Sequence, residues 1–201
     1  MGFQLESFAG AGGAEAVAAG DPAVLFRVLS PGMRLAIWQR RPPRHWAGRV
    51  TPLLAAGPFR AVAEDEPEVA VDRVLAALPV PPPALMVQDM RMLAGLFAVI
   101  TVCPRVRIRL EGVEGIPCPR WHADAVPLRL LCTYRGIGTE WLAGAGVGGV
   151  PNGIAAPSVA VLKGRGFPGE PDGGCLHRSP PRGGRRLVLC IDLPGHFPDE
   201  A

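Results

Sequence analysis

The sequence is poor in the side chains that most often carry out catalysis. Its 201 residues include four histidines, four serines and one tyrosine, and Lys163 is the single lysine among 21 basic residues. Neither a P-loop nor a GxSxG nucleophile elbow occurs, and Lys163, at the end of a predicted strand, is expected in solvent. These absences exclude the common phosphate-loop and serine-hydrolase patterns, so the position of each histidine is informative.

Charge is also scarce. Charged residues make up 19% of the chain with a net charge of +3, whereas 48% of residues are hydrophobic. Disorder needs the opposite balance, so the 26 glycines and 23 prolines are interpreted as turns of a compact domain. Because the charge is not strongly basic, a solvated basic loop is favoured over a nucleic-acid patch for the arginine-rich segment 40–49, and no nucleic-acid partner is expected.

Signals for targeting and for a disulfide framework are missing as well. The first residues, MGFQLE, lack the cationic start and the apolar run of a signal peptide, which predicts a cytoplasmic protein. The five cysteines are an odd number without a CxxC pair, so we expect free thiols. The apolar run 92–103 is shorter than the roughly 20 residues that cross a bilayer, so no membrane association is expected.

The first part of the chain has helical patterns. A short helix is predicted over 21–29, where an aspartate N-cap precedes a proline, and a second over 66–78. A longer helix is predicted over 84–101, because apolar residues recur there at intervals of three and four. Residues 1–20 are small and rich in glycine and alanine, so we expect a loosely ordered arm.

After Pro104 the period changes from helical to two. Apolar residues alternate with arginines over 105–110, and the arginine face is expected in water, with an anion site as the alternative. Further strands are predicted over 35–38, 128–134, 158–163 and 186–193, with a long glycine-rich loop before 158. This pattern indicates an α+β fold in which residues 21–201 form one domain, with a mainly helical part (21–103) and a β part (104–195).

One set of polar residues has the spacing of a metal site. His122 and Asp124 are two apart in an extended segment, which turns both side chains to one face, and His177 follows 53 residues after Asp124. Two histidines and a carboxylate form the facial triad of non-haem Fe(II) enzymes, which leaves coordination positions open for substrate and oxygen. We therefore predict that His122, Asp124 and His177 bind a metal ion.

A basic residue follows the second histidine. Arg186 opens the last predicted strand nine residues after His177. In 2-oxoglutarate-dependent oxygenases an arginine at about this distance binds the distal carboxylate of the cosubstrate with both arms of its guanidinium group. Arg186 is the predicted cosubstrate residue, and Arg185 is its competitor.

Four runs of sequence carry a family resemblance. They are RWHADAVPLRLLCTYRGIGTEWL at 120–142, VAVLKG at 159–164, LHRSPP at 176–181 and RRLVLCIDL at 185–193. These runs resemble the bacterial family catalogued as domain of unknown function 1826, and that resemblance spans most of the chain. Residues 118–193 are more distantly similar to the prolyl-hydroxylase-like branch of Fe(II)/2-oxoglutarate oxygenases.

The oxygenase resemblance implies a fold and a set of cofactors. The helical N-terminal half would pack on a C-terminal cupin-like double-stranded β-helix, a jelly-roll barrel. The three metal ligands would bind Fe(II), and Arg186, with help from Tyr134, would bind 2-oxoglutarate. Two positions depart from the family pattern: Val188 stands where a serine often follows the cosubstrate arginine, and Ile137 where the turn often has proline.

Other interpretations of these residues stay open. Without a metal, the two histidines and the aspartate form a hydrogen-bonded polar cluster. Cys118 and Cys175 could instead join the two histidines in a closed Cys2His2 zinc site, although neither spacing matches a zinc-finger knuckle. A GxGxxG match at 144–149 lacks the helix and the acid that a dinucleotide site needs, so we exclude that site.

The sequence therefore predicts a metal-binding protein that is an Fe(II)/2-oxoglutarate-dependent oxygenase-like enzyme. Its substrate is expected to be a small molecule or a protein side chain. The alternative is a non-catalytic zinc-binding or metal-handling protein that uses the same three ligands.

Overall fold

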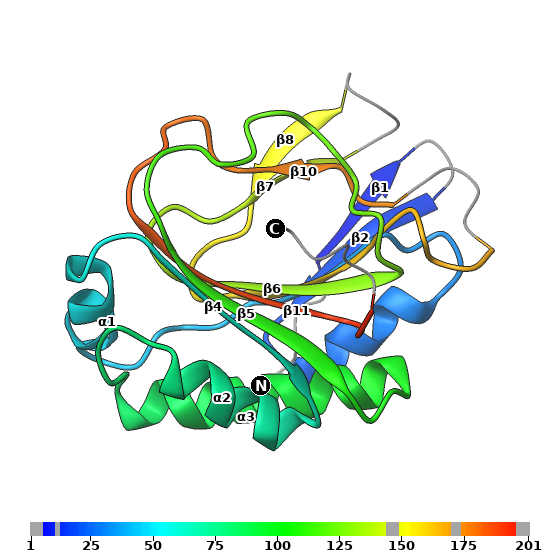
Figure 1. The fold of residues 1–201 in the computed structure, drawn as a ribbon. Coiled ribbons are helices and arrows are strands. Elements are labelled where there is room, and N and C mark those ends of the chain that lie inside the picture. Colours follow the sequence, from blue (N-terminus) through cyan, green and yellow to red (C-terminus); the bar gives the residue numbers. More distant parts are fainter. Residues whose placement is uncertain (1–5, 11–12, 144–148, 170–173, 196–201) are drawn as a thin grey trace.

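A layer of helices, a large β-sheet and a small β-sheet stack on one another in the computed structural model (Figure 1). The structure describes residues 6–10, 13–143, 149–169 and 174–195. The helices cover one face of the large sheet, and the small sheet lies over its other face. The fold is a mixed α+β arrangement, as the sequence pattern indicates.

The helices lie in the first part of the chain. They are the 3-10 helix η1 (Pro22–Leu29) and the α-helices α1 (Trp46–Ala55), α2 (Pro67–Ala76) and α3 (Ala84–Thr101). The side chain of Asp21 accepts a hydrogen bond from the backbone N–H of Ala23 at 2.8 Å and so caps η1. α3 buries the face that its sequence spacing predicts, which includes Met90 and Phe97. α1 was not predicted, because Gly48 and Pro52 interrupt its helical pattern.

The large sheet has eight strands in the order β1-β2-β3-β9-β6-β11-β5-β4. The strands are β1 (Glu6–Gly10), β2 (Gly13–Ala19), β3 (Leu35–Trp38), β4 (Phe59–Asp65), β5 (Val106–Val113), β6 (Leu128–Arg135), β9 (Val159–Lys163) and β11 (Arg186–Asp192). β2 and β3 are parallel, and the other neighbours are antiparallel. The strands predicted over 35–38, 128–134, 158–163 and 186–193 are confirmed to within a residue or two.

The small sheet contains β7 (Glu140–Ala143), β8 (Val150–Gly153) and β10 (His177–Arg178), in the order β10-β7-β8. His122 extends this sheet through an antiparallel bridge to His177. From β5 onward the chain therefore alternates between the sheets: β6, β9 and β11 belong to the large sheet, and the elements between them belong to the small one. The expected glycine-rich loop before 158 is wrong over Val150–Gly153, which form β8, and its residues 144–148 lie outside the described part of the chain.

Alternation along each central strand separates two apolar regions. On β5, Ile108 and Leu110 are fully buried in the core under the helices, whereas Arg109 points to the space between the sheets. A second apolar cluster lies between the sheets and includes Trp141 and Leu162. The helices thus cover one face of the large sheet with an apolar core. The other face borders the space between the two sheets, which contains both polar and apolar side chains.

The N-terminal part differs from expectation in two respects. Residues 13–19 do not belong to a loose arm, because they form β2, and Ala16 and Val17 are buried on opposite faces of the sheet in the two apolar clusters. Residues 1–5 and 11–12 of the expected arm lie outside the described part of the chain. The part 21–103 is not only helical, since it supplies β3 and β4 to the large sheet.

Three further expectations concern single features. Lys163 is not in solvent: it is 1% exposed, and its Nζ donates to the carbonyl oxygen of Ser30 at 3.1 Å. All five cysteines are free thiols. α3 is long and apolar enough to cross a membrane by length and composition, with a mean hydropathy of 1.4, a test that the core helix of a soluble protein also passes.

Candidate metal centre

The structure brings His122, Asp124 and His177 together beside the small sheet. One ligand atom from each residue lies within 4.8 Å of the others. Oδ2 of Asp124 is 3.3 Å from Nε2 of His177, and Oδ1 is 3.9 Å from Nε2 of His122. Ligand atoms about 2.0–2.2 Å from a shared ion lie roughly 3 Å apart when their bonds meet at right angles. A small inward movement therefore lets all three residues bind one ion.

Backbone pairing positions the two histidines. His122 and His177 exchange both of their backbone hydrogen bonds, with N–O distances of 3.1 and 2.9 Å, and their ring centroids are 4.6 Å apart. Asp124 follows His122 by two residues, so its carboxylate turns to the same side of the extended segment. The HxD spacing thus produces the convergence that the sequence predicts.

Each imidazole ring is also held by its second nitrogen. Nδ1 of His122 lies 3.0 Å from the carbonyl oxygen of Arg120, and Nδ1 of His177 lies 3.1 Å from that of Cys175. Because a carbonyl oxygen only accepts, each Nδ1 carries a proton, and Nε2 is the ring nitrogen that faces Asp124 and is available to a metal ion. Burial lowers the pKa of His177, which favours the neutral ring that a metal ligand needs.

Arg129 orients the carboxylate of Asp124. Its Nη1 donates to Oδ1 of Asp124, while Nε and Nη2 donate to Asp192 at 2.7 and 3.1 Å. Arg129 and Asp192 are paired in the β6–β11 register and are 7% and 1% exposed. The sequence analysis missed Arg129. The sequence feature that could have identified Arg129 is a charged side chain within an otherwise apolar predicted strand. Such a side chain is costly to bury without a partner.

The surroundings of the second carboxylate oxygen of Asp124 indicate whether a metal ion fits the site. Oδ2 of Asp124 is buried and accepts no hydrogen bond from the described residues. An unsatisfied carboxylate oxygen is costly in a folded protein, and a bound cation removes that cost. The donor set of two imidazole nitrogens and one carboxylate oxygen suits Fe(II) and Zn(II). The site therefore fits a divalent metal ion of this kind.

A cavity of about 430 Å³ lies beside these residues, between the two sheets. Arginine side chains dominate its polar lining: Arg60, Arg109, Arg129, Arg178 and Arg186. The arginine face of β5, which was expected in water, contributes Arg109 to this wall, where its Nε lies 3.1 Å from Oε2 of Glu111. The expectation of a solvated face is therefore wrong for Arg109, and the alternative of an anion site stays a prediction.

Arg186 is the predicted cosubstrate residue that lines this cavity. It is 4% exposed, its Nη2 donates to Oγ of Ser179 at 2.9 Å, and its buried Nε has no hydrogen-bond partner among the described residues. Burial lowers the pKa of Arg186, a cost of desolvation that a bound anion would offset. Val188, on the same face of β11, adds an apolar side chain to the cavity.

Two predicted cosubstrate residues lie elsewhere. Tyr134 faces the helices, where its hydroxyl donates to Oδ2 of Asp89 on α3 at 2.8 Å. Arg185 is exposed, and its Nε lies 3.5 Å from Oε1 of Glu114. The physical reason is the period of two along a strand: Tyr134 has the opposite parity to Arg129 on β6, and Arg185 the opposite parity to Arg186. Neither residue lines the cavity beside the metal ligands.

The closed Cys2His2 site is not formed. Within the described parts of the chain, the group that can hold one ion contains His122, Asp124 and His177 and no cysteine. Cys118 is exposed and Cys175 is buried. Burial raises the pKa of Cys175 to about 12, which favours the thiol over the thiolate that zinc binds.

Several solved oxygenase structures are similar to this chain. A Pseudomonas putida prolyl-4-hydroxylase is 14% identical, with a TM-score of 0.45 over 85% of this chain and 96% of that one. The rice dioxygenase for auxin oxidation is 16% identical, with a TM-score of 0.44 over 75% of this chain. This chain covers 63% of the rice protein, less than two thirds of its length. At these TM-scores the similarity says nothing about the activity of this chain.

The sequence comparisons give the family. No curated protein matches the sequence. One family model matches residues 19–192, a range that covers most of the chain and contains His122, Asp124 and His177. The chain therefore belongs to the family described as "Protein of unknown function (DUF1826)".

Proposed function

We propose that this protein is a non-haem Fe(II)/2-oxoglutarate-dependent oxygenase. The observation that carries the proposal is the pairing of two features in one cavity. Two of the three converging ligands, His122 and His177, line the cavity together with a buried arginine, Arg186, whose Nε–H has no hydrogen-bond partner among the described residues. The carboxylate of Asp124 lies beside the two histidines. The first feature suits a metal ion, and the second suits the carboxylate of an organic acid.

The chain topology supports the same proposal. The alternation of strands between the large and the small sheet is the arrangement expected of a double-stranded β-helix, with the metal ligands at one end of the barrel. β5, β6, β9 and β11 would be its strands in the large sheet. The N-terminal strands β1 to β4 would extend that sheet at both of its edges.

The protein's own residues would prepare the site in three ways. The Arg120 and Cys175 carbonyl groups keep the Nδ1 protons of the two histidines in place, so that Nε2 is ready to bind. Arg186 would bind the distal carboxylate of 2-oxoglutarate, and the Ser179 hydroxyl would replace the serine that is missing at position 188. When bound, Fe(II) would supply the redox chemistry that couples oxidation of 2-oxoglutarate to that of a substrate.

The size of the cavity bears on the substrate. Its volume of about 430 Å³ is in the range of small-molecule sites. A small molecule or a protein side chain therefore remains the proposed substrate. A cytoplasmic location also stays a prediction, which the five free thiols support.

Binding of 2-oxoglutarate to the Zn²⁺-loaded full chain tests the proposal without turnover. Isothermal titration calorimetry should give saturable binding that weakens roughly 100-fold in Arg186→Gln, because the substitution replaces the buried, charged guanidinium with a neutral amide. Arg185→Gln is the matched control, since the neighbouring side chain is exposed and outside the cavity.

Turnover is then measured with Fe(II), 2-oxoglutarate and oxygen, as the formation of succinate. Formation of succinate that requires Fe(II) and Arg186 supports the oxygenase. Tight Zn²⁺ binding with no affinity for 2-oxoglutarate would instead support the metal-handling alternative. Absence of metal binding would overturn both.

A further inference from the structure

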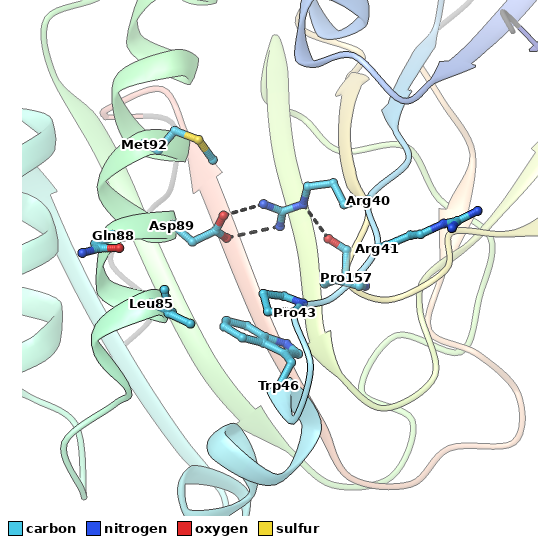
Figure 2. Close-up of a pocket in the computed structure, with 9 residues that line it drawn as sticks. All are labelled: Arg40, Arg41, Pro43, Trp46, Leu85, Gln88, Asp89, Met92 and Pro157. Atoms are coloured by element: carbon cyan, nitrogen blue, oxygen red, sulfur yellow. Dashed lines mark hydrogen bonds and ion pairs between the residues drawn. The ribbon is translucent and has the colours of Figure 1, made fainter. Parts of the chain in front are cut away.

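A second cavity, of about 460 Å³, lies on the helix-covered side of the large sheet (Figure 2). Segment 40–46 forms one wall, α3 forms the opposite wall, and Pro157 closes part of the floor. The sequence analysis interpreted segment 40–49 as a solvated basic loop. That interpretation is wrong for Arg40, whose side chain is 12% exposed, and holds for Arg41, which is exposed and extends away from the cavity centre in Figure 2.

An ion pair forms the polar part of this cavity. Nη1 of Arg40 donates to Oδ1 of Asp89, and Nη2 donates to Oδ2 at 3.2 Å. Figure 2 shows the two side chains meeting each other, Arg40 from the 40–46 segment and Asp89 from α3. Because the charges of Arg40 and Asp89 cancel, the floor of the cavity is polar but neutral.

Almost every hydrogen-bonding position of the pair is already used. Nε of Arg40 donates to the carbonyl oxygen of Pro157 at 2.9 Å, and Nη2 also reaches Sγ of Cys132 at 3.3 Å. Oδ2 of Asp89 also accepts from the Tyr134 hydroxyl at 2.8 Å. By the donor and acceptor capacity of the two groups, one N–H on Nη1 and one lone pair on Oδ1 remain. The open donor and the open acceptor belong to neighbouring atoms.

Apart from Arg41 and Gln88, the remaining lining is apolar. Trp46 and Pro43 come from the segment 40–46, and Leu85 and Met92 come from α3. Leu85 and Met92 are 43% and 45% exposed, so part of their apolar surface faces the cavity uncovered. Apolar walls around a few convergent polar atoms are the usual composition of a small-molecule site.

We propose that this cavity binds a neutral ligand that carries an amide edge, such as a carboxamide or a lactam, on an apolar ring. An amide places a carbonyl acceptor beside an N–H donor. The carbonyl accepts from Nη1 of Arg40, and the N–H donates to Oδ1 of Asp89. The ring packs between Trp46 and Leu85. The site is independent of the metal centre, which lies on the other face of the large sheet.

The charge balance argues for this class of ligand over an organic acid. A carboxylate has no N–H to donate, so it would leave Oδ1 of Asp89 unsatisfied and place two anions together. Its charge would also be taken out of water beside a cation that already pairs with Asp89. Arg41, the other cation of the lining, is exposed and extends away from the cavity centre. Benzamide and benzoate have nearly the same shape, but only benzamide is neutral and carries an N–H donor. Together they are therefore suitable test ligands.

The experiment is a ligand-observed NMR titration of the full chain with benzamide and, separately, with benzoate. We expect saturable binding of benzamide and binding of benzoate that is weaker by roughly tenfold or more. Met92→Arg places a long side chain at the mouth of the cavity and should abolish benzamide binding. Val99→Arg is the matched control, because Val99 is 63% exposed on the same helix and outside the cavity.

Each other outcome overturns the proposal. These outcomes are no binding of benzamide up to its solubility limit, equal affinity for benzoate, or benzamide binding that survives in Met92→Arg. If circular dichroism shows that Met92→Arg is not folded, Leu85→Arg takes its place, since that side chain is also half exposed at the cavity wall.

Discussion

Arg129 donates a hydrogen bond to Oδ1 of Asp124 and leaves Oδ2 of the same carboxylate facing His177. One oxygen is thus occupied by a protein cation, and the other is buried without a hydrogen bond. This arrangement favours a carboxylate that binds a metal through a single oxygen. Asp192 in turn holds Arg129 from β11, so two strands of the large sheet fix the orientation of one ligand.

Removal of this support should weaken metal binding. Arg129→Met alone would leave Asp192 buried and unpaired, so the test uses the double variant Arg129→Met, Asp192→Leu, which replaces a buried ion pair with apolar side chains. We expect a folded protein with a metal affinity lower by roughly 10–100-fold. Titration calorimetry with Zn²⁺ measures this affinity in the wild-type protein and in the double variant. An unchanged affinity would show that Arg129 does not position Asp124.

Gly164 should be intolerant of a side chain. A Cβ at this position would lie 2.0 Å from the carbonyl oxygen of Val126 and 2.7 Å from that of Asp124. Gly164→Ala therefore has to displace the backbone that carries Asp124. We expect a loss of roughly 1–3 kcal/mol in the free energy of unfolding, together with weaker metal binding. Chemical denaturation and metal titration measure the two effects.

Gly153→Ala is the control for this substitution, because a Cβ there meets no atom within 4 Å. Equal stability of the two alanine variants would contradict the close approach at Gly164.

The cysteines should differ in reactivity. Burial raises the pKa values of Cys132, Cys175 and Cys190 to about 12, whereas Cys118 is exposed. Because the thiolate is the reactive form, iodoacetamide at pH 8 should modify Cys118 in the folded protein and leave the three buried thiols intact. Mass spectrometry of the digested protein locates the label. Labelling of Cys132 as fast as Cys118 without denaturant would be inconsistent with its burial.

The same three thiols predict a loss of stability in alkali. Their pKa values are about 12 in the folded chain against 9.0 for an unperturbed thiol, so above pH 9 the unfolded chain releases protons that the folded chain keeps. The free energy of unfolding should therefore fall as the pH rises from 9 towards 12. Urea denaturation at several pH values measures this slope, and Cys190→Ala should make it shallower. A flat profile would contradict the prediction.

The features that could be predicted from the sequence are those with a local pattern. α3 and β5 have clear helical and alternating periods. His122 and Asp124 have a spacing that fixes their common face in an extended segment. One antiparallel bridge, between His122 and His177, is enough to bring His177 to these two residues.

The features that could not be predicted depend on strand parity and register. Tyr134 and Arg185 were assigned to the site by their place in the sequence, but a shift of one residue along a strand reverses the face. The partnership of Arg129 with Asp192 appears only when β6 is aligned with β11. The ion pair of Arg40 with Asp89 joins residues 49 positions apart that share no local pattern.

The position of β2 has a consequence for shortened forms of this protein. The family match begins at residue 19, yet β2 spans Gly13–Ala19 and pairs along the whole of β3. A chain that starts near residue 20 would leave the backbone N–H and C=O groups on one side of β3 open to other chains. β3 reads LAIW and is almost entirely buried, so this new edge would be apolar and prone to aggregation.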